Sequence, residues 1–235
     1  MSSSARICLI ADGYIQDLVT CINAITRFTD TPVTVLVNGK QPTKELDSLN
    51  SNTQITRRES KNPLGWGNVV NHFLEQEEED FLIFMDPSTI FLDNPITKTL
   101  NSFSTLAGAA ESIAAVGWKG GLVNTDDEWR SIKDVGNGEV DVLFSYFMAI
   151  DRKFAKDIGG ANPSAKYYRN ADLEFSLRLR AAGRKIFQID LPLKQERHHG
   201  FHDVDPDYRE KMSRKNYQRI LDNFRGRPEI LSARR

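Results

Sequence analysis

The feature that most limits the fold of this chain is a regular alternation between short apolar runs and segments with helical periodicity. Strand-like apolar runs occupy residues 6–11, 33–39, 80–86, 113–118, 140–150 and 185–190, with a shorter edge-strand pattern at 53–58. Helical patterns fill intervals between them at residues 15–28, 42–50 and 65–76. This order predicts an α/β fold, in which a mostly parallel sheet is flanked by helices on both faces.

Length and composition indicate one domain. The 235 residues, 40% of them hydrophobic, suit a single continuous core, and a net charge of −1 gives no reason to expect a nucleic-acid partner. Cys8 and Cys21 both lie in apolar patterns, so two cysteines predict neither a disulfide framework nor a zinc cluster. The apolar run near the N-terminus is too short for a secretion signal. No segment approaches the ~18 apolar residues of a transmembrane helix, so we expect a cytoplasmic protein.

Polar turns follow three of the expected strands. They lie at residues 12–14, 38–40 and 86–88. Each alone is an ordinary turn, but ligands of open α/β sheets bind beyond the carboxyl ends of the strands. Three such turns at one edge predict a pocket, and its candidate ligand-binding side chains are Asp12, Asn38, Asp86 and Ser88.

The segment NADLEFSLRLRAAG, residues 170–183, predicts a helix that is apolar over much of its circumference and lies between layers. Asn170 suits its N-cap, and Glu174 and Arg178 form a pair at i,i+4. Asp172 has no such partner within its helix. Two interpretations remain open for Asp172: it offsets the positive end of the helix, or it projects into a cleft and accepts a proton.

Several short motifs, taken in order, resemble those of the family 2 glycosyltransferases. PLGWGNVVNHF at 63–73 is similar to the family's glycine-bearing helix start, and FLIFMDPSTIFL supplies Asp86 and Ser88 at its DxD-type motif. GGANP and then NADLEFSLRLRAAG resemble the family's G-G-F-D-like turn and its E-D-x-D-L-S-L-R-L-R-x-A-G helix. RHHGFHD at 197–203 lies where the family often has a histidine. The resemblance spans about residues 6–200, and the helix motif is its specific part.

The resemblance implies the GT-A (Rossmann-like) fold in one domain over residues 1–235. A donor half would reach about residue 110, and an acceptor half over about 111–235 would end in a basic helix. It implies transfer of one sugar from a nucleotide-sugar donor, a UDP-sugar being favoured, to an acceptor hydroxyl with inversion. Such transfer needs one base, and Asp172 stands at the family's base position. The Q-x-x-R-W signature of processive synthases is missing, so we expect a hexosyltransferase-type enzyme that is not processive.

Three departures from the family pattern support a rival hypothesis. Ser88 replaces the second metal-binding carboxylate, Ala171 replaces the Glu of the E-D pair, and Asn38 stands where an acidic residue often contacts the base. The rival is a catalytically impaired GT-A-like protein that binds nucleotide sugars or acts as a scaffold. A sugar nucleotidyltransferase would need a G-x-G-x-R loop after the first strand. ADGYIQD occupies that position, so we set this reading aside.

A departing pyrophosphate needs positive charge, usually a hard divalent cation with oxygen ligands. Asp86 provides one ligand, and His198 and His202 are candidates to complete a Mn²⁺ or Mg²⁺ site, because Mn²⁺ accepts imidazole. Two other interpretations remain open. The histidines form a solvated surface loop, or Lys and Arg side chains of the C-terminal stretch provide the charge.

For the acceptor, the sequence suggests Trp118, which ends a strand before a flexible loop, and Glu174, beside Asp172. The acceptor itself stays open among a glycan, a lipid-linked molecule and a small molecule. Residues 208–235 are basic and have helical spacing. Such a helix packs on the sheet with a solvated face, binds donor phosphates, or makes peripheral contact with anionic lipid.

Overall fold

The computed structural model describes residues 4–39, 44–47, 55–106 and 112–234. Its centre is one eight-stranded sheet with the order β3-β2-β1-β4-β11-β6-β12-β9. The strands that pair in parallel are β3 (Ile55–Ser60), β2 (Val33–Asn38), β1 (Ala5–Ala11) and β4 (Phe81–Met85), and, as a second group, β6 (Ile113–Gly117) and β12 (Lys185–Gln188). Two strands run antiparallel to their neighbours, β11 (Phe147–Asp151) and β9 (Gly138–Val140). The expected single α/β domain with a mostly parallel sheet is confirmed, and β3 lies at an edge as expected.

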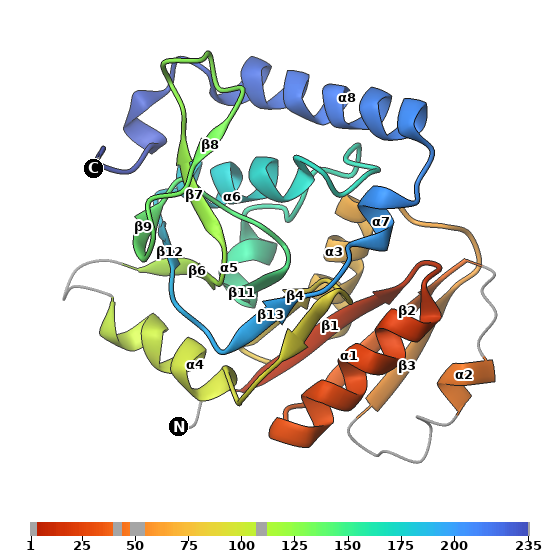
Figure 1. Ribbon diagram of the computed structural model, residues 1–235. Helices are drawn as coiled ribbons and strands as arrows, with labels where there is room; N and C mark the ends of the chain where they lie inside the picture. Colours follow the sequence, from red (N-terminus) through yellow and green to blue (C-terminus); the bar gives the residue numbers. More distant parts are fainter. Residues whose placement is uncertain (1–3, 40–43, 48–54, 107–111, 235) are drawn as a thin grey trace.

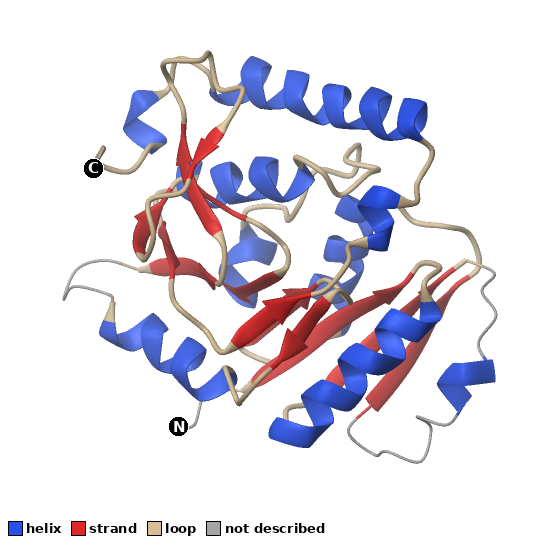
Figure 2. Cartoon of the chain, in the orientation of Figure 1, coloured by secondary structure: helices blue, strands red, loops and turns tan. Residues whose placement is uncertain are grey.

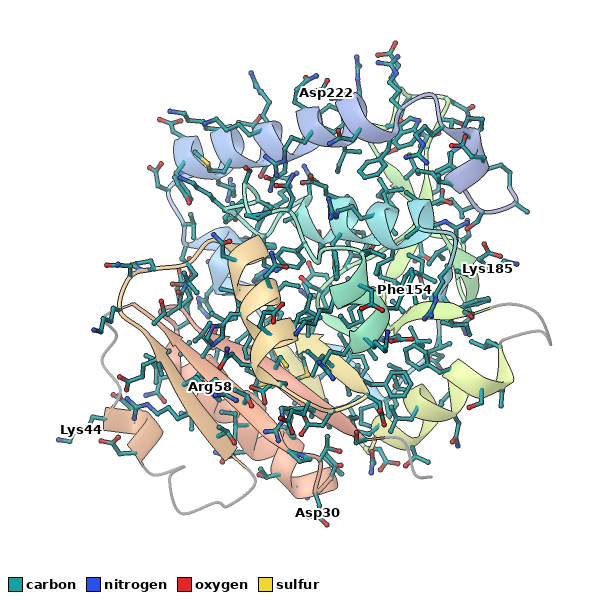
Figure 3. The ribbon with its side chains drawn as sticks, turned by 180° about the vertical axis from the view of Figure 1, so that it is seen from behind. Asp30, Lys44, Arg58, Phe154, Lys185 and Asp222 are labelled. Carbon is teal, nitrogen blue, oxygen red and sulfur yellow. The ribbon has the colours of Figure 1, made fainter. Side chains whose placement is uncertain are left out.

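Helices cover both faces of this sheet (Figures 1 and 2). On one face lie α1 (Ile15–Phe28) and α4 (Ile96–Thr105), and on the other lie α3 (Trp66–Gln76), α5 (Arg152–Asp157) and α6 (Ala171–Ala181). Figure 3 shows the second face from behind, with Phe154 of α5 labelled. In α1 the buried residues Leu18, Cys21, Ile22 and Ile25 recur at helical spacing, which is why one stripe of this helix faces the sheet.

Outside these layers, α8 (Pro206–Phe224) packs along α6 and runs across one end of the molecule (Figure 1). The remaining helices are short: α2 (Lys44–Asp47), α7 (His199–His202) and a 3₁₀ turn (Pro228–Ile230). The rest of the helix expected at 42–50 lies outside the described residues. Within the described ranges, no helix has both the length and the hydropathy that crossing a bilayer requires.

Smaller sheets flank the main one. One pairs β5 (Thr89–Phe91) with β13 (Leu193–Gln195), and the other orders β10 (Val142–Leu143), β7 (Gly120–Val123) and β8 (Ile132–Lys133). The expectation of one strand over 140–150 is therefore wrong, because β9, β10 and β11 divide this run between two sheets. The break lies at Asp141, whose buried carboxylate accepts hydrogen bonds from the Val123 and Ser232 backbone N–H groups at 2.8 and 2.5 Å. A buried carboxylate needs such partners, and Asp141, between β9 and β10, has them together with the Arg234 guanidinium at 2.7 Å.

The predicted ion pair within α6 is wrong, whereas the predicted N-cap position of Asn170 is confirmed. Glu174 pairs with Arg219 of α8, at 2.8 Å between Oε2 and Nη2, while Arg178 donates to the carbonyls of Gly160 and Ile158. Asn170 does occupy the N-cap position, but its side chain donates to the Ser213 carbonyl of α8 instead of capping α6. In both cases a partner on α8, far away in the sequence, takes the place of the local one.

Candidate functional site

Two cavities adjoin at the carboxyl edge of the parallel strands. The first, of about 580 Å³, is lined mainly by the turns that follow β1, β2 and β4 and by the start of α3. The second, of about 990 Å³, lies among α6, α8 and the small sheet of β7, β8 and β10. Four residues line both: Asp86, Ser145, Tyr168 and His198. The two cavities therefore meet at these four residues.

The first pocket brings together the four polar side chains predicted at the strand ends. All of Asp12, Asn38, Asp86 and Ser88 line it. Asn38 is buried and uses its amide on the backbone of Leu64, accepting from the N–H at 2.7 Å and donating to the carbonyl at 3.0 Å. Burial raises the pKa of the Asp12 carboxyl, and a hydrogen bond from Asn38 opposes that rise. Asn38 thus positions Asp12, whose carboxylate is the group presented to a ligand.

Asp86 is oriented by its neighbour in the DxD-like position. The backbone N–H and hydroxyl of Ser88 both donate to Oδ1 of Asp86, at 2.8 and 2.5 Å. Its other oxygen, Oδ2, lies 3.5 Å from Nε2 of His198. That nitrogen is buried and makes no hydrogen bond with any described residue. Burial lowers the pKa of His198, with Asp86 opposing the change, so the ring is held in its neutral form.

These two atoms satisfy part of a cation site. Two cis ligands that bind one cation at ~2.1 Å lie on the order of 3 Å apart, close to the Asp86–His198 separation. No group of three or more His, Cys, Asp or Glu side chains in the described part of the chain is able to hold a metal ion. His202 is exposed, lines neither pocket and so does not join the other two. The protein offers a cation two ligands, and a ligand's own oxygens would have to provide the others.

Asp172 lines the second pocket from the first turn of α6. Its Oδ2 accepts from the Ser145 backbone N–H at 3.0 Å and from the Ser145 hydroxyl at 3.4 Å, and Oδ1 accepts from the Leu173 N–H at 2.9 Å. Burial raises its pKa to about 6, and these hydrogen bonds oppose the rise. A carboxyl with this pKa is largely ionised near neutral pH and still takes up a proton readily.

Residues that the sequence did not single out complete the walls. Tyr146 and Tyr168 flank the His198 ring, with centroids 5.8 and 4.7 Å away. Burial raises the pKa of both phenols, so they stay neutral. Arg169 and Trp129 line the second pocket as well. The tripeptide YYR directly before the helix motif was the available signal for Tyr168 and Arg169, but aromatic and basic residues in a loop are too common to identify a site.

The two residues expected to bind the acceptor line neither pocket. Trp118 packs against the core on the α1 side of the sheet, with the Lys119 ammonium 4.4 Å from its ring. Glu174 is buried and binds both Arg219 and, at 2.6 Å, the amide of Asn162. Their surroundings give both side chains structural contacts, so the second pocket draws on other residues.

Helix α8 fixes the loop that carries the pocket residues. The Asn216 amide donates to the carbonyls of Tyr167 and Arg169, both at 2.8 Å, and is itself buried. Since Asn170 also bonds to α8, the backbone just before α6 is held at three points. This helix is therefore part of the site's framework, which a solvated helix packed on the sheet would not be.

Comparison with solved structures places this architecture among the glycosyltransferases. A crystal structure of GalNAc-T7 with UDP, GalNAc and Mn²⁺ matches with a TM-score of 0.71 and 12% identity, covering 96% of this chain and 48% of that one. The mannosyltransferase PcManGT from Pyrobaculum calidifontis, in complex with GDP-Man and Mn²⁺, gives 0.66 and 10%, with coverages of 97% and 66%. TarS 1–349 from S. aureus gives 0.60 and 12%, with 96% and 74%. The chain spans about half of the GalNAc-T7 chain.

The fold is thus the GT-A-like glycosyltransferase fold that the motif resemblance predicted. No protein-family model matches the sequence. A search of curated proteins gives no match either.

Proposed function

We propose that this protein transfers one sugar from a nucleotide-sugar donor to an acceptor hydroxyl with inversion, as a family 2-like, non-processive glycosyltransferase. The observation that carries the proposal is the meeting of two pockets at Asp86, Ser145 and His198, with Asp172 bound to Ser145. A donor in the first pocket and an acceptor in the second would face each other there. Most residues of the first pocket precede residue 110 and most of the second follow it, which supports a donor half and an acceptor half.

For the donor, the first pocket offers a hydrogen-bond acceptor at one end and a cation-binding pair at the other. The Asp12 carboxylate, positioned by Asn38, suits the N–H groups of a nucleobase. Asp86 and His198 would hold a divalent cation together with the pyrophosphate. Such a cation neutralises the charge that develops on the leaving nucleoside diphosphate. UDP is our preferred nucleotide.

For the acceptor, Asp172 is the proposed base. It accepts hydrogen bonds from Ser145 and Leu173, which fix its direction, and burial keeps it basic enough to take a proton from a hydroxyl. One base and direct displacement form no covalent intermediate, so the product would have inverted anomeric configuration.

A specific observation favours the second candidate, a catalytically impaired binding or scaffold protein. Ser88 and Ala171 leave the site two carboxylates short of the family pattern, and the described residues give a cation only two ligands. Slow release of free nucleotide separates the two functions. The enzyme should release nucleoside diphosphate from one donor of a nucleotide-sugar panel, whereas a scaffold would bind nucleotide and release none above the blank.

The experiment has two stages. A thermal-shift panel of nucleoside diphosphates, with and without Mn²⁺, should identify one that stabilises the protein, because a ligand raises stability by RT ln(1 + [L]/Kd). The matching nucleotide sugars are then tested for release of nucleoside diphosphate. If no nucleotide changes the melting temperature, the donor-site proposal is wrong.

A further inference from the structure

One of the arginines that line the second pocket forms no ion pair with a described residue. Three arginines line this pocket. Arg130 lies 3.6 Å from Glu128, and Arg214 lies 3.2 Å from Glu210. Arg169 forms neither a hydrogen bond through its guanidinium nor an ion pair within the described part of the chain. An exposed guanidinium is ordinarily solvated, so the contacts around Arg169 decide whether it is a binding group.

That setting holds Arg169 in place from two sides. Its carbonyl accepts from Asn216, and its guanidinium lies 5.3 Å from the centre of the Phe201 ring. The Arg209 guanidinium lies 4.4 Å from the centre of the same ring and donates a hydrogen bond to the Phe201 carbonyl at 2.6 Å. The guanidinium of Arg169 is therefore laid on an aromatic face, and its N–H groups stay available to a ligand.

The positive charge of Arg169 opposes the rise that burial causes in the pKa of Tyr146, which lines the same pocket. Arg169 precedes Asp172 by three residues, and both line the pocket. The pocket thus contains a planar donor group as well as the base, and this group matches a carboxylate or phosphate oxygen pair.

Another part of the pocket lining is apolar and includes a residue of a strained turn. Glu128 and Trp129 are consecutive non-glycine residues with left-handed φ angles of 62° and 70°. Such conformations are costly for residues with a side chain and persist where surrounding contacts impose them. Here the Tyr217 hydroxyl donates to the Glu128 carbonyl at 3.1 Å, and the Trp129 N–H donates to the Asn124 carbonyl at 2.9 Å. The strained turn presents the indole beside the apolar side chains of Leu173, Leu177 and Ile220.

We propose that this pocket binds an acceptor that carries an anionic group, a carboxylate or a phosphate, next to an apolar moiety. Arg169 contacts the anion, and the wall around Trp129 packs against the apolar part. The pocket is larger than one sugar ring needs, at about 990 Å³, and its lining combines a guanidinium with aromatic surface. This inference rests on the proposed function, since it names the class of molecule that enters the acceptor side.

Binding of matched phenyl glycosides to the intact protein tests the proposal without turnover. The probes are phenyl β-glucoside, phenyl β-glucuronide, phenyl β-glucoside 6-phosphate and methyl β-glucuronide, measured by calorimetry with and without nucleoside diphosphate and Mn²⁺. A charged hydrogen bond to Arg169 should make at least one anionic phenyl probe bind ~10-fold or more tightly than the neutral one. The phenyl glucuronide should also exceed the methyl one. The two anionic probes distinguish carboxylate from phosphate.

Variants assign the preference to a residue. In Arg169→Gln the anionic preference should fall to within ~2-fold, and Arg169→Lys should keep part of it, because lysine retains the charge without the planar fork. Arg27→Gln is the matched control: Arg27 is exposed on α1, outside both pockets, and its loss should change nothing. Equal binding of neutral and anionic probes overturns the proposal. The proposal is also overturned if Arg169→Gln keeps the preference for anionic probes. It is overturned as well if Arg169→Gln weakens only the binding of nucleotide.

Failure of the proposed function gives a different result. If no nucleoside diphosphate binds the wild-type protein, the donor site is wrong, and the probe preference measured without nucleotide still decides the anionic pocket. If nucleotide binds and the probes show no preference, the donor site stands and this inference is rejected.

Discussion

The Arg219 guanidinium of α8 holds the carboxylate of Glu174 on α6, with Nη2 and Oε2 2.8 Å apart. Glu174 is 2% exposed and Arg219 22%, so the pair is largely removed from water. Asn216, which also bonds to Arg219, donates to the loop before α6. This network joins α8 to the base-bearing helix.

Glu174→Gln should therefore destabilise the protein strongly. Removing one charge of a buried pair leaves the other unpaired, and we expect a loss on the order of 3 kcal/mol in the free energy of unfolding. Glu210→Gln breaks the exposed pair with Arg214 on α8 and should cost less than ~1 kcal/mol. Urea denaturation of both variants measures the difference. Equal midpoints for the two variants would show that the α6–α8 pair contributes little.

Gly67→Ala tests the close approach of α3 to the loop that leads to the second pocket. A Cβ at Gly67 would lie 1.9 Å from the carbonyl oxygen of Asn162, and the Gly67 N–H donates to the Ala165 carbonyl. Because the obstacle is backbone, the loop must move or α3 must shift. We expect a loss of more than ~2 kcal/mol, in the range of overpacked cores. Asn68→Ala, on the exposed side of the same helix, should be neutral or slightly stabilising. A Gly67→Ala variant as stable as wild type contradicts this packing.

The cation-binding pair predicts a metal-dependent effect on nucleotide affinity. Asp86→Asn and His198→Gln should each weaken nucleoside diphosphate binding ~10-fold or more with Mn²⁺ present and change it little without Mn²⁺. Because both side chains bind one cation, the nucleotide affinity of the double variant should be hardly lower than that of the weaker-binding single variant. Ser88→Ala should have a smaller effect, since its backbone N–H still orients Asp86. Calorimetric titrations compare these four variants with the wild type. Full additivity, or equal losses without Mn²⁺, would separate Asp86 and His198 from a shared site.

Sequence patterns predicted the parts of this molecule that depend on local order. Runs such as 6–11 and 80–86 are apolar because parallel strands are buried on both faces, and they identified β1 and β4 with their polar ends. The division of 140–150 was not predicted, although Asp141 interrupts the run, because an apolar run does not specify which sheet it joins. Periodicity within α6 suggested Arg178 for Glu174. The true partner lies 45 residues away, beyond any spacing rule.

For the site too, the sequence predicted residues placed by the sheet but not residues placed by tertiary contacts. Asp12, Asn38, Asp86 and Ser88 come together because parallel strands end at one edge, which is a property of the sheet. Tyr146 and Trp129 belong to loops and to a small sheet, whose paths depend on tertiary contacts such as the Tyr217–Glu128 hydrogen bond. His198 directly precedes the short helix α7 and His202 ends it, and only the folded chain shows which of them faces Asp86.

The last prediction concerns Asp172, whose pKa burial raises from 3.8 to about 6. As a base it must be ionised, so kcat/KM should fall tenfold per pH unit below about pH 6. Asp172→Asn keeps the shape and removes the basicity, so transfer should drop by ~10²-fold or more while donor affinity stays within a factor of a few.

The pH dependence of stability provides a second test of the raised pKa of Asp172. The folded-state pKa of Asp172 lies above the unfolded value, so between about pH 4 and pH 6 the folded state binds more protons than the unfolded state. Ionisation of this buried carboxyl should therefore lower the free energy of unfolding by on the order of 3 kcal/mol as the pH rises through that window. Above about pH 6 it should cause no further change. Asp172→Asn lacks this loss, so the stability of wild type relative to the variant should decrease from pH 4 to pH 7. Urea titrations at both pH values measure the change. A constant difference would mean that Asp172 has an ordinary pKa, and near-normal turnover of the variant would remove it from the mechanism.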